Sequence, residues 1–170
     1  MSYLLDTNTF ITAKKKFYAY DIVPTFWQTL LEKFHAGTVK IIDAVEEELL
    51  VGDDDLADWI KKNIQKGKDV NSCPFVIPSK NDVEVITNYQ TMANKIFNNQ
   101  QYSPPNKQKF FSGADPWLVA SADIYNGTVV TFEEMPGANS KKIKIPDVCQ
   151  QMDVHCVNLY EMMRNTEIKI

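Results

Sequence analysis

Short apolar runs that stop abruptly at polar, helix-starting residues constrain the fold of this chain more than any other feature. Tyr3–Leu5 stops at Asp6, and similar runs occupy 39–42 and 128–132. Runs this short, apolar throughout, are typical of strands buried on both faces, as in a parallel sheet. Residues 154–157 and 143–145 are further short candidates, and the proline-bracketed stretch 73–78 is at best an edge segment.

Between these runs, apolar residues recur at helical spacing, and capping residues mark where helices begin and end. Helices are expected close behind Asp6, around 26–34 with Gly37 as C-cap, and over 44–51, 56–60, 83–96, 115–122, 146–152 and 159–163. Strands that alternate with helices predict the α/β class, as a three-layer α/β/α sandwich with a central, mainly parallel sheet. We see no internal repeat or linker, so residues 1–170 are expected to form a single domain.

Size and composition fit this expectation. A chain of 170 residues can bury one core, and 44% hydrophobic with 24% charged residues is ordinary for a globular protein. No apolar run approaches the roughly 20 residues that a membrane helix needs, and the start meets Asp6 too early for a signal-peptide core. Three irregularly spaced cysteines favour a reducing compartment, so we expect a cytoplasmic protein without membrane contact.

Four carboxylates follow the predicted strands in a way that brings them together. Asp6 ends the first strand, Glu133 follows the strand at 128–132, Asp115 opens a helix, and Glu48 lies in the helix after the second strand. In open α/β sheets, ligands bind beyond the carboxyl ends of the strands. We therefore expect Asp6, Glu48, Asp115 and Glu133 to form one acidic site there.

The choice of Glu48 among three consecutive glutamates rests on helical phase. Successive helical residues differ by about 100° in direction. Glu47 points away from the buried stripe that includes Leu49, and Glu46 forms a predicted capping box with Asp43. Glu48 flanks the stripe on the other side and is the best placed to reach a neighbouring site.

Each of these acids also has a purely structural explanation. Asp6 can satisfy a loop as an Asx-turn, and Asp115 can serve only as an N-cap. Glu48 can be a solvated helix residue, and Glu133 one of a charged pair with Glu134. The ordered arrangement of all four favours a site.

A cluster of carboxylates without histidine or cysteine suits Mg²⁺ or Mn²⁺. Close carboxylates repel one another unless a cation intervenes. Such cations activate water and stabilise charge on a phosphodiester, which predicts phosphodiester hydrolysis. Cys149, His155 and Cys156 lack the spacing of a zinc site, so both cysteines are expected to be small buried side chains.

Four segments that contain these acids resemble the motifs of PIN-domain nucleases, in the same order along the chain. Residues 3–8 resemble the strand that ends in Asp-Thr-Asn, 45–49 the second acidic motif, and 115–122 the Asp that opens an apolar helix. Residues 130–133 resemble the fourth motif, although Glu133 stands where Asp is more common. Segments 52–59, 112–117 and 144–149 are similar to a bacterial, largely uncharacterised, toxin-like PIN group.

The resemblance implies a Mg²⁺- or Mn²⁺-dependent single-stranded RNA endonuclease, the toxin of a type II toxin–antitoxin pair. It also implies a cognate antitoxin and a homodimer as partners. In such an enzyme Asp6, Glu48 and Asp115 bind the metal and Glu133 helps to order it. Residues expected to orient ligands or phosphate are Thr7, Asn8 and Ser112.

Lysine clusters at 14–16, 107–109 and 141–144 offer a basic rim despite a net charge of −4. Lys107 and Lys109 are the candidates for RNA contact, and Tyr102 and Phe110 are candidates for stacking on bases.

Two other functions stay open from the sequence. One is a catalytically weak or inactive protein of this fold that binds RNA or a protein partner. The other is a metal-dependent nuclease or phosphatase that acts on DNA.

Overall fold

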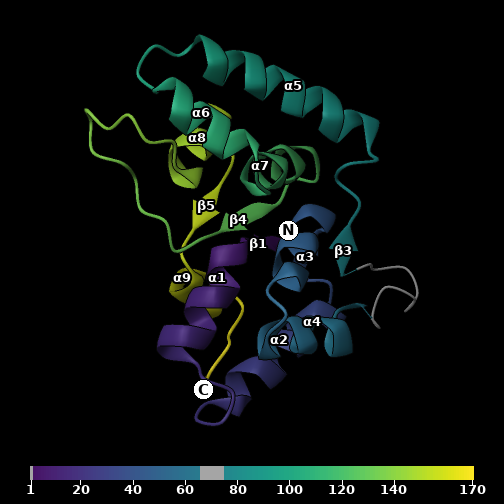
Figure 1. The fold of residues 1–170 in the computed structure, drawn as a ribbon. Helices are drawn as coiled ribbons and strands as arrows, with labels where there is room; N and C mark the ends of the chain where they lie inside the picture. The colour runs from purple at the N-terminus through teal and green to yellow at the C-terminus, as the bar shows by residue number, and fades with distance from the viewer. Residues whose placement is uncertain (1, 66–74) are drawn as a thin grey trace.

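A five-stranded parallel sheet organises the chain, with strand order β3-β2-β1-β4-β5 (Figure 1). The computed structural model describes residues 2–65 and 75–170. The strands are β1 (Tyr3–Leu5), β2 (Val39–Ile42), β3 (Val76–Ile77), β4 (Thr128–Val130) and β5 (Cys156–Val157). The predicted strands at 3–5 and 39–42 are confirmed to the residue, whereas those at 128–132 and 154–157 are shorter than expected.

Helices cover both faces of the sheet. Figure 1 shows α5 to α8 on one side and α1, α2, α4 and α9 on the other, which confirms the predicted three-layer sandwich. The helices are α1 (Thr7–Thr12), the π-helix η1 (Ala13–Phe17), α2 (Pro24–His35), α3 (Asp43–Val51), α4 (Asp55–Asn63), α5 (Val83–Asn98), α6 (Pro104–Phe111), α7 (Asp115–Ile124), α8 (Ile145–Gln151) and α9 (Leu159–Asn165).

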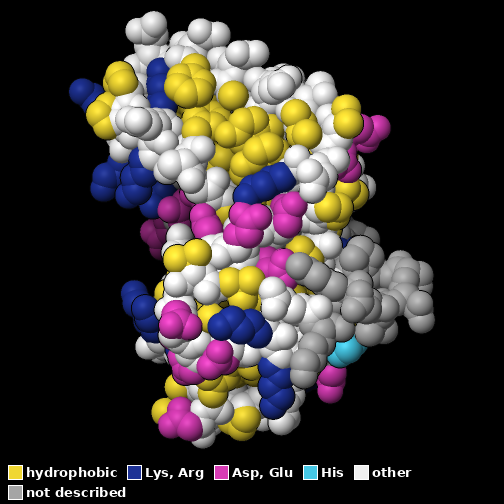
Figure 2. All heavy atoms as spheres, turned by 45° about the vertical axis from the view of Figure 1, so that its right-hand side comes forward, with side chains coloured by type: hydrophobic (Ala, Val, Ile, Leu, Met, Phe, Trp, Pro, Cys, Tyr) yellow, Lys and Arg dark blue, Asp and Glu magenta, His cyan; other side chains and the backbone are white. Residues whose placement is uncertain are grey.

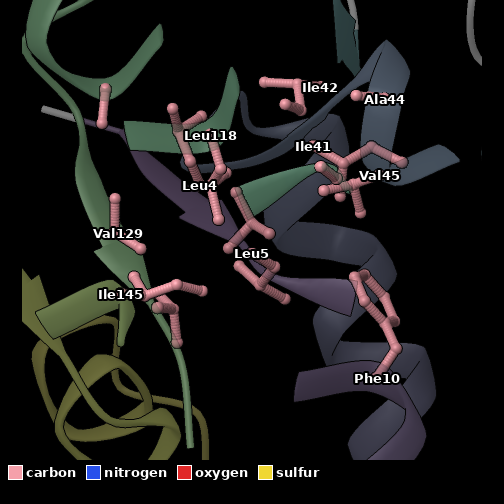
Figure 3. Packing of buried hydrophobic residues seen from close by; sticks show 14 of the residues in the cluster. Leu4, Leu5, Phe10, Ile41, Ile42, Ala44, Val45, Leu118, Val129 and Ile145 are labelled. Carbon is pink, nitrogen blue, oxygen red and sulfur yellow. The ribbon is translucent and has the colours of Figure 1, made fainter. Parts of the chain in front are cut away.

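Strand β1 lies in the middle of the sheet with helices on both faces, which explains why its sequence is apolar without alternation. Leu4 pairs in register with Lys40 of β2 and Val129 of β4. Leu4 and Leu5 are both buried, pointing to opposite faces of the sheet. Figure 3 shows these leucines packed among the side chains of neighbouring elements, such as Leu118 of α7. No helix within residues 2–65 and 75–170 is long and apolar enough to span a bilayer.

Two local predictions are wrong. Ile145 is the first residue of α8, not part of a strand, because Pro146 suits the second position of a helix. The predicted capping box has Asp43 at the N-cap of α3, but the N-cap is Ile42 and Asp43 is the first helical residue. The Asp43 carboxylate accepts hydrogen bonds from the Ala44 amide at 2.8 Å, from the Ser79 hydroxyl and, at 3.2 Å, from the Lys80 amide after β3.

Helix α6 was not predicted from the sequence. Of the stretch 73–78, the structure describes residues 75–78. α6 begins at Pro104 behind Ser103, but Phe110 is its only buried residue, so its apolar periodicity is weak. β3 occupies Val76–Ile77 at the edge of the sheet, as expected for such a segment, while residues 73 and 74 lie outside the described residues.

Candidate active site

Asp6 lies directly beyond the carboxyl end of β1, where the strand order reverses between β1 and β4. Its backbone amide donates to the Val130 carbonyl at 3.0 Å, and the Thr131 hydroxyl donates to its Oδ2 at 2.9 Å. Only 1% of Asp6 is exposed. Its Oδ1 is buried and accepts no hydrogen bond of normal geometry from the described residues.

Burial dominates the electrostatics of Asp6. It raises the pKa of the carboxyl group to about 8, and the charge of Asp115 adds to the increase. The hydrogen bond from Thr131 and the backbone of Asn8 lower the pKa, while Glu133 raises it slightly. At neutral pH Asp6 therefore keeps its proton unless positive charge comes close to it.

Asp115 is the first residue of α7 and is half-buried. Desolvation raises its pKa to about 7, followed by the charges of Glu133 and Glu48, while Lys144 and Lys109 lower it. The four predicted acids are thus electrostatic neighbours. Asp115 is a helical residue and not the N-cap, which is Ala114.

Glu48 joins α3 to the start of α7. Its Oε2 accepts from the Thr7 hydroxyl at 2.5 Å, and its Oε1 accepts from the Ala114 amide at 2.8 Å. A Cβ atom at Gly113 would lie 3.1 Å from Oε1, so the absence of a side chain there leaves room for this contact. Thr7 was expected to orient ligands, and in the structure its hydroxyl orients Glu48.

The two glutamates before Glu48 have other surroundings. Glu47 is exposed and forms an ion pair with Lys80 on the surface, as its predicted direction requires. Glu46, predicted as the capping partner of Asp43, is 4% exposed. Glu48 is the glutamate that contacts the residues on both sides of the acidic site.

Glu133 uses both carboxylate oxygens within the protein. Oε1 accepts from Lys144 Nζ at 2.6 Å, and Oε2 accepts from the Ile145 amide at 2.9 Å. Its own amide donates to the Thr131 hydroxyl at 3.1 Å. Because β4 ends at Val130, Glu133 lies in the loop beyond the strand and ties that loop to the start of α8.

Residues 3–170 match the family described as a domain of unknown function, DUF4411. The chain belongs to this family. No curated protein matches the sequence. Among solved structures, the DUF4411 chain is similar to one described as VapBC2 from Rickettsia felis bound to a DNA fragment from their promoter. The similarity covers 93% of this chain and 98% of the other, with a TM-score of 0.55 and 15% identity, and it supports the PIN-like fold.

The ligand-orienting and RNA-binding candidates of this DUF4411 chain occupy two sides of the acids. Asn8 is exposed and lines a cavity of about 450 Å³ together with Glu133 and Lys144. Ser112 is exposed and lines a second cavity, of about 280 Å³, together with Glu48. The Ser112 hydroxyl donates to the Lys109 carbonyl at 2.7 Å.

The aromatic candidates for base stacking are wrong. Tyr102 is 3% exposed and Phe110 is 5% exposed, so neither can offer a ring face to a base. Lys107 donates to the Phe97 carbonyl at 2.8 Å, whereas Lys109 is exposed and close enough to affect Asp115.

The four carboxylates offer oxygen donors, which suit a hard divalent cation better than zinc. Asp6 has a buried oxygen without a partner, and Asp115 is its charged neighbour. The carboxylate oxygens of Glu48 and Glu133 already accept hydrogen bonds. Across the described part of the chain, no three His, Cys, Asp or Glu side chains lie close enough together to hold one ion.

Thr131 and Lys144 are site residues that the acidic motifs do not single out. Thr131 hydrogen-bonds to Asp6, and Lys144 pairs with Glu133 and lowers the pKa of Asp115. The sequence signal for Thr131 is its place directly after the apolar residues Val129 and Val130, near the end of the predicted strand at 128–132. Lys144 belongs to a lysine cluster and opens the segment 144–149, but neither pattern predicts its contact with Glu133.

Proposed function

We propose that this chain is a Mg²⁺- or Mn²⁺-dependent endonuclease for single-stranded RNA and the toxin of a type II toxin–antitoxin pair. The observation that carries the proposal is the buried Asp6 carboxylate with one unpartnered oxygen, placed beside Asp115 at the switch point of a PIN-like sheet. The fold similarity to a VapBC2 structure supports the toxin–antitoxin part. A cognate antitoxin, a homodimer and a cytoplasmic location belong to the same proposal.

Asp6 and Asp115 would hold the cation, with water completing its coordination. A cation bound there lowers the pKa of a bound water and offsets the charge that develops on the phosphate. The Thr131 hydroxyl bonds to Oδ2, while Oδ1 stays buried without a hydrogen-bond partner among the described residues. Glu48 acts on Asp115 through its charge and through the Ala114 amide, which it holds one residue earlier.

Glu133 would act mainly through the loop that it anchors, because Lys144 and Ile145 occupy its oxygens. In the hydrolysis, water attacks the phosphorus in line and the bond to the 3′ oxygen breaks. The products carry a 5′-phosphate and a 3′-hydroxyl. Asn8 and Ser112 are exposed and line the two cavities beside Glu133 and Glu48, and they would contact the flanking phosphates.

The direct test is cleavage of a labelled single-stranded RNA by purified protein with Mn²⁺ or with a chelator. Wild type should cleave only with the cation, and Asp6→Asn should lose at least about 100-fold in rate, as expected for loss of a catalytic metal ligand. Asp58→Asn is the matched control, since Asp58 is an exposed carboxylate on α4 that pairs with Lys61 outside the site. Wild-type protein that leaves RNA intact under all conditions would contradict the proposal.

One observation favours a second candidate, a protein of this fold that binds RNA or a protein partner without cleavage. Glu133 replaces the usual Asp and is neutralised by Lys144, which leaves one acid fewer for a cation. RNA binding by wild type without cleavage, unchanged in the Asp6→Asn variant, would support this candidate. Activity on single-stranded DNA in the same assay would instead indicate a DNA-directed nuclease.

A further inference from the structure

Phe97 and Phe111 stack at the C-terminal ends of α5 and α6, and we call this ring pair, whose outer member Phe97 is exposed, the aromatic platform. Their rings stack with centroids 4.9 Å apart and an interplanar angle of 15°. Phe97 is 55% exposed, whereas Phe111 is partly buried, contacts the ring of Tyr89 and packs against the core. Because Phe97 stacks on Phe111 with one face, its other face or its edge is free to contact a further planar group.

The aromatic platform borders a hollow with both apolar and cationic walls. The hollow has a volume of about 630 Å³, and its wall consists of Phe97, Pro104, Lys107, Gln108, Phe111 and Ser112. Lys107 donates to the Phe97 carbonyl, which holds the ammonium group beside the platform. Figure 2 shows hydrophobic side chains gathered over the upper helices, with a basic side chain between them and a band of acidic ones.

The hollow adjoins the cavity that Glu48 lines. Phe111 and Ser112 line both this hollow and the neighbouring cavity that reaches Glu48 and Ala114. Lys109, on the same helix as Phe111, is exposed and near Asp115. A chain of phosphates running from the acids toward the platform would therefore pass lysines, which offset the repulsion from the carboxylates.

We propose that the aromatic platform stacks against an unpaired base of an RNA strand whose backbone crosses the acidic site. This inference rests on the proposed function. Base–aromatic stacking accepts any base and works together with nearby cations, which is the combination found here. A base on Phe97 would continue the stack that Phe111 and Phe97 already form. The flanking lysines and the path to the acids favour a nucleic acid strand over a protein segment.

Two substitutions at Phe97 separate stacking from general apolar contact. Phe97→Leu keeps an apolar side chain without a ring, and Phe97→Trp keeps a larger ring. Val83→Ala is the control, because Val83 is a 75% exposed apolar residue in the first turn of the same helix. All variants are made in the Asp6→Asn background, in which the RNA should stay intact. Binding of a labelled single-stranded RNA is measured by fluorescence anisotropy with Mg²⁺ present, and the mass of each variant by sedimentation velocity.

The expected result is that Phe97→Leu weakens RNA binding about 10-fold, while Phe97→Trp and Val83→Ala stay within about twofold of the Asp6→Asn parent. Equal binding by the Leu variant and its parent would overturn the platform and leave the nuclease proposal intact. A Leu variant that binds RNA normally but changes from dimer to monomer would overturn it too, in favour of a contact between two copies. If the parent binds no RNA and wild type cleaves none, the proposed function fails and this inference fails with it.

Discussion

Burial of the Asp6 carboxyl group beside Asp115 links the candidate site to the stability of the whole protein. Its pKa is about 8 in the folded protein, against 3.8 for the ordinary group. Between these two values the unfolded chain releases the proton while the folded protein keeps it. The folded state then binds more protons, so the free energy of unfolding falls as the pH rises.

We predict that, with a chelator present, wild-type protein loses stability steadily between about pH 4 and pH 8 because of Asp6. Each pKa unit corresponds to about 1.4 kcal/mol. Asp6→Asn removes the titrating group, so its free energy of unfolding should depend less on pH and exceed that of wild type at pH 8. Urea unfolding at several pH values measures this difference. Parallel pH curves for the two proteins would contradict the account.

Thr131 offers a second test at the scale of single residues. Thr131→Val keeps the shape of the side chain and removes the hydroxyl that donates to Asp6. We expect a loss of about 1–3 kcal/mol in unfolding free energy, as for other unsatisfied buried polar groups, and slower RNA cleavage. Thr131→Ser, which keeps the hydroxyl, is the control and should retain most of both properties. Unchanged stability of Thr131→Val would show that this hydrogen bond contributes little.

Sequence patterns predict some members of the site better than others. Asp6 and Asp115 sit at element boundaries, so their positions follow once the strand and the helix are recognised. The surroundings of Glu133 depend on Lys144, 11 residues later, and on where an intervening loop returns. No local pattern specifies that return. The burial of Glu46 was likewise not predicted. Helical phase gives the direction of a side chain, but not which other elements pack against it.

At the scale of elements, the loop between β4 and α8 is expected to depend on Glu133. Glu133→Ala leaves Lys144 and the Ile145 amide without their acceptor. We predict faster amide hydrogen exchange across 133–145 and a loss of about 1 kcal/mol, since Lys144 is partly exposed and solvent screens the ion pair. Glu133→Gln still offers an acceptor to Ile145 and should keep most of the RNA cleavage. Complete loss of cleavage in Glu133→Gln would instead indicate a direct role in metal binding.

The element that sequence analysis missed shows where periodicity fails. α6 buries only Phe110 and follows a polar stretch, so no apolar stripe marks it. Its start was nonetheless visible as Ser103 before Pro104, a capping residue followed by a residue suited to the first helical turn. This helix carries Lys107, Lys109 and Phe111. Without it, the sequence could not predict that these residues lie together along the proposed RNA path.

At the scale of the whole molecule, periodicity predicts a parallel sheet but not its strand order. The order β3-β2-β1-β4-β5 depends on the direction of each crossover, and it is this order that places Asp6 beside Thr131 at the switch point. The acids could thus be assigned to one edge of the sheet from the sequence. Which of them face one another required the three-dimensional structure.

The toxin proposal concerns the intact protein in a cell. Induced expression of wild type should arrest bacterial growth, and Asp6→Asn at the same protein level should not, because the arrest depends on RNA cleavage. Co-expression of the neighbouring reading frame, if it encodes a short DNA-binding protein, should restore growth. Equal growth of cells that express wild type and Asp6→Asn would contradict a toxin role without bearing on the fold.

The central claim, a divalent cation site built around Asp6, is tested most directly by thermal unfolding at pH 8 with Mn²⁺ or with a chelator. A cation at about 100 times its Kd stabilises the folded state by about 2.7 kcal/mol. For a domain of this size, that corresponds to a rise in Tm of roughly 5–10 °C. Wild type and Asp58→Asn, which changes an exposed carboxylate on α4, should show this rise with Mn²⁺, and Asp6→Asn should show almost none. An equal rise in all three proteins, or none in wild type, would contradict the account.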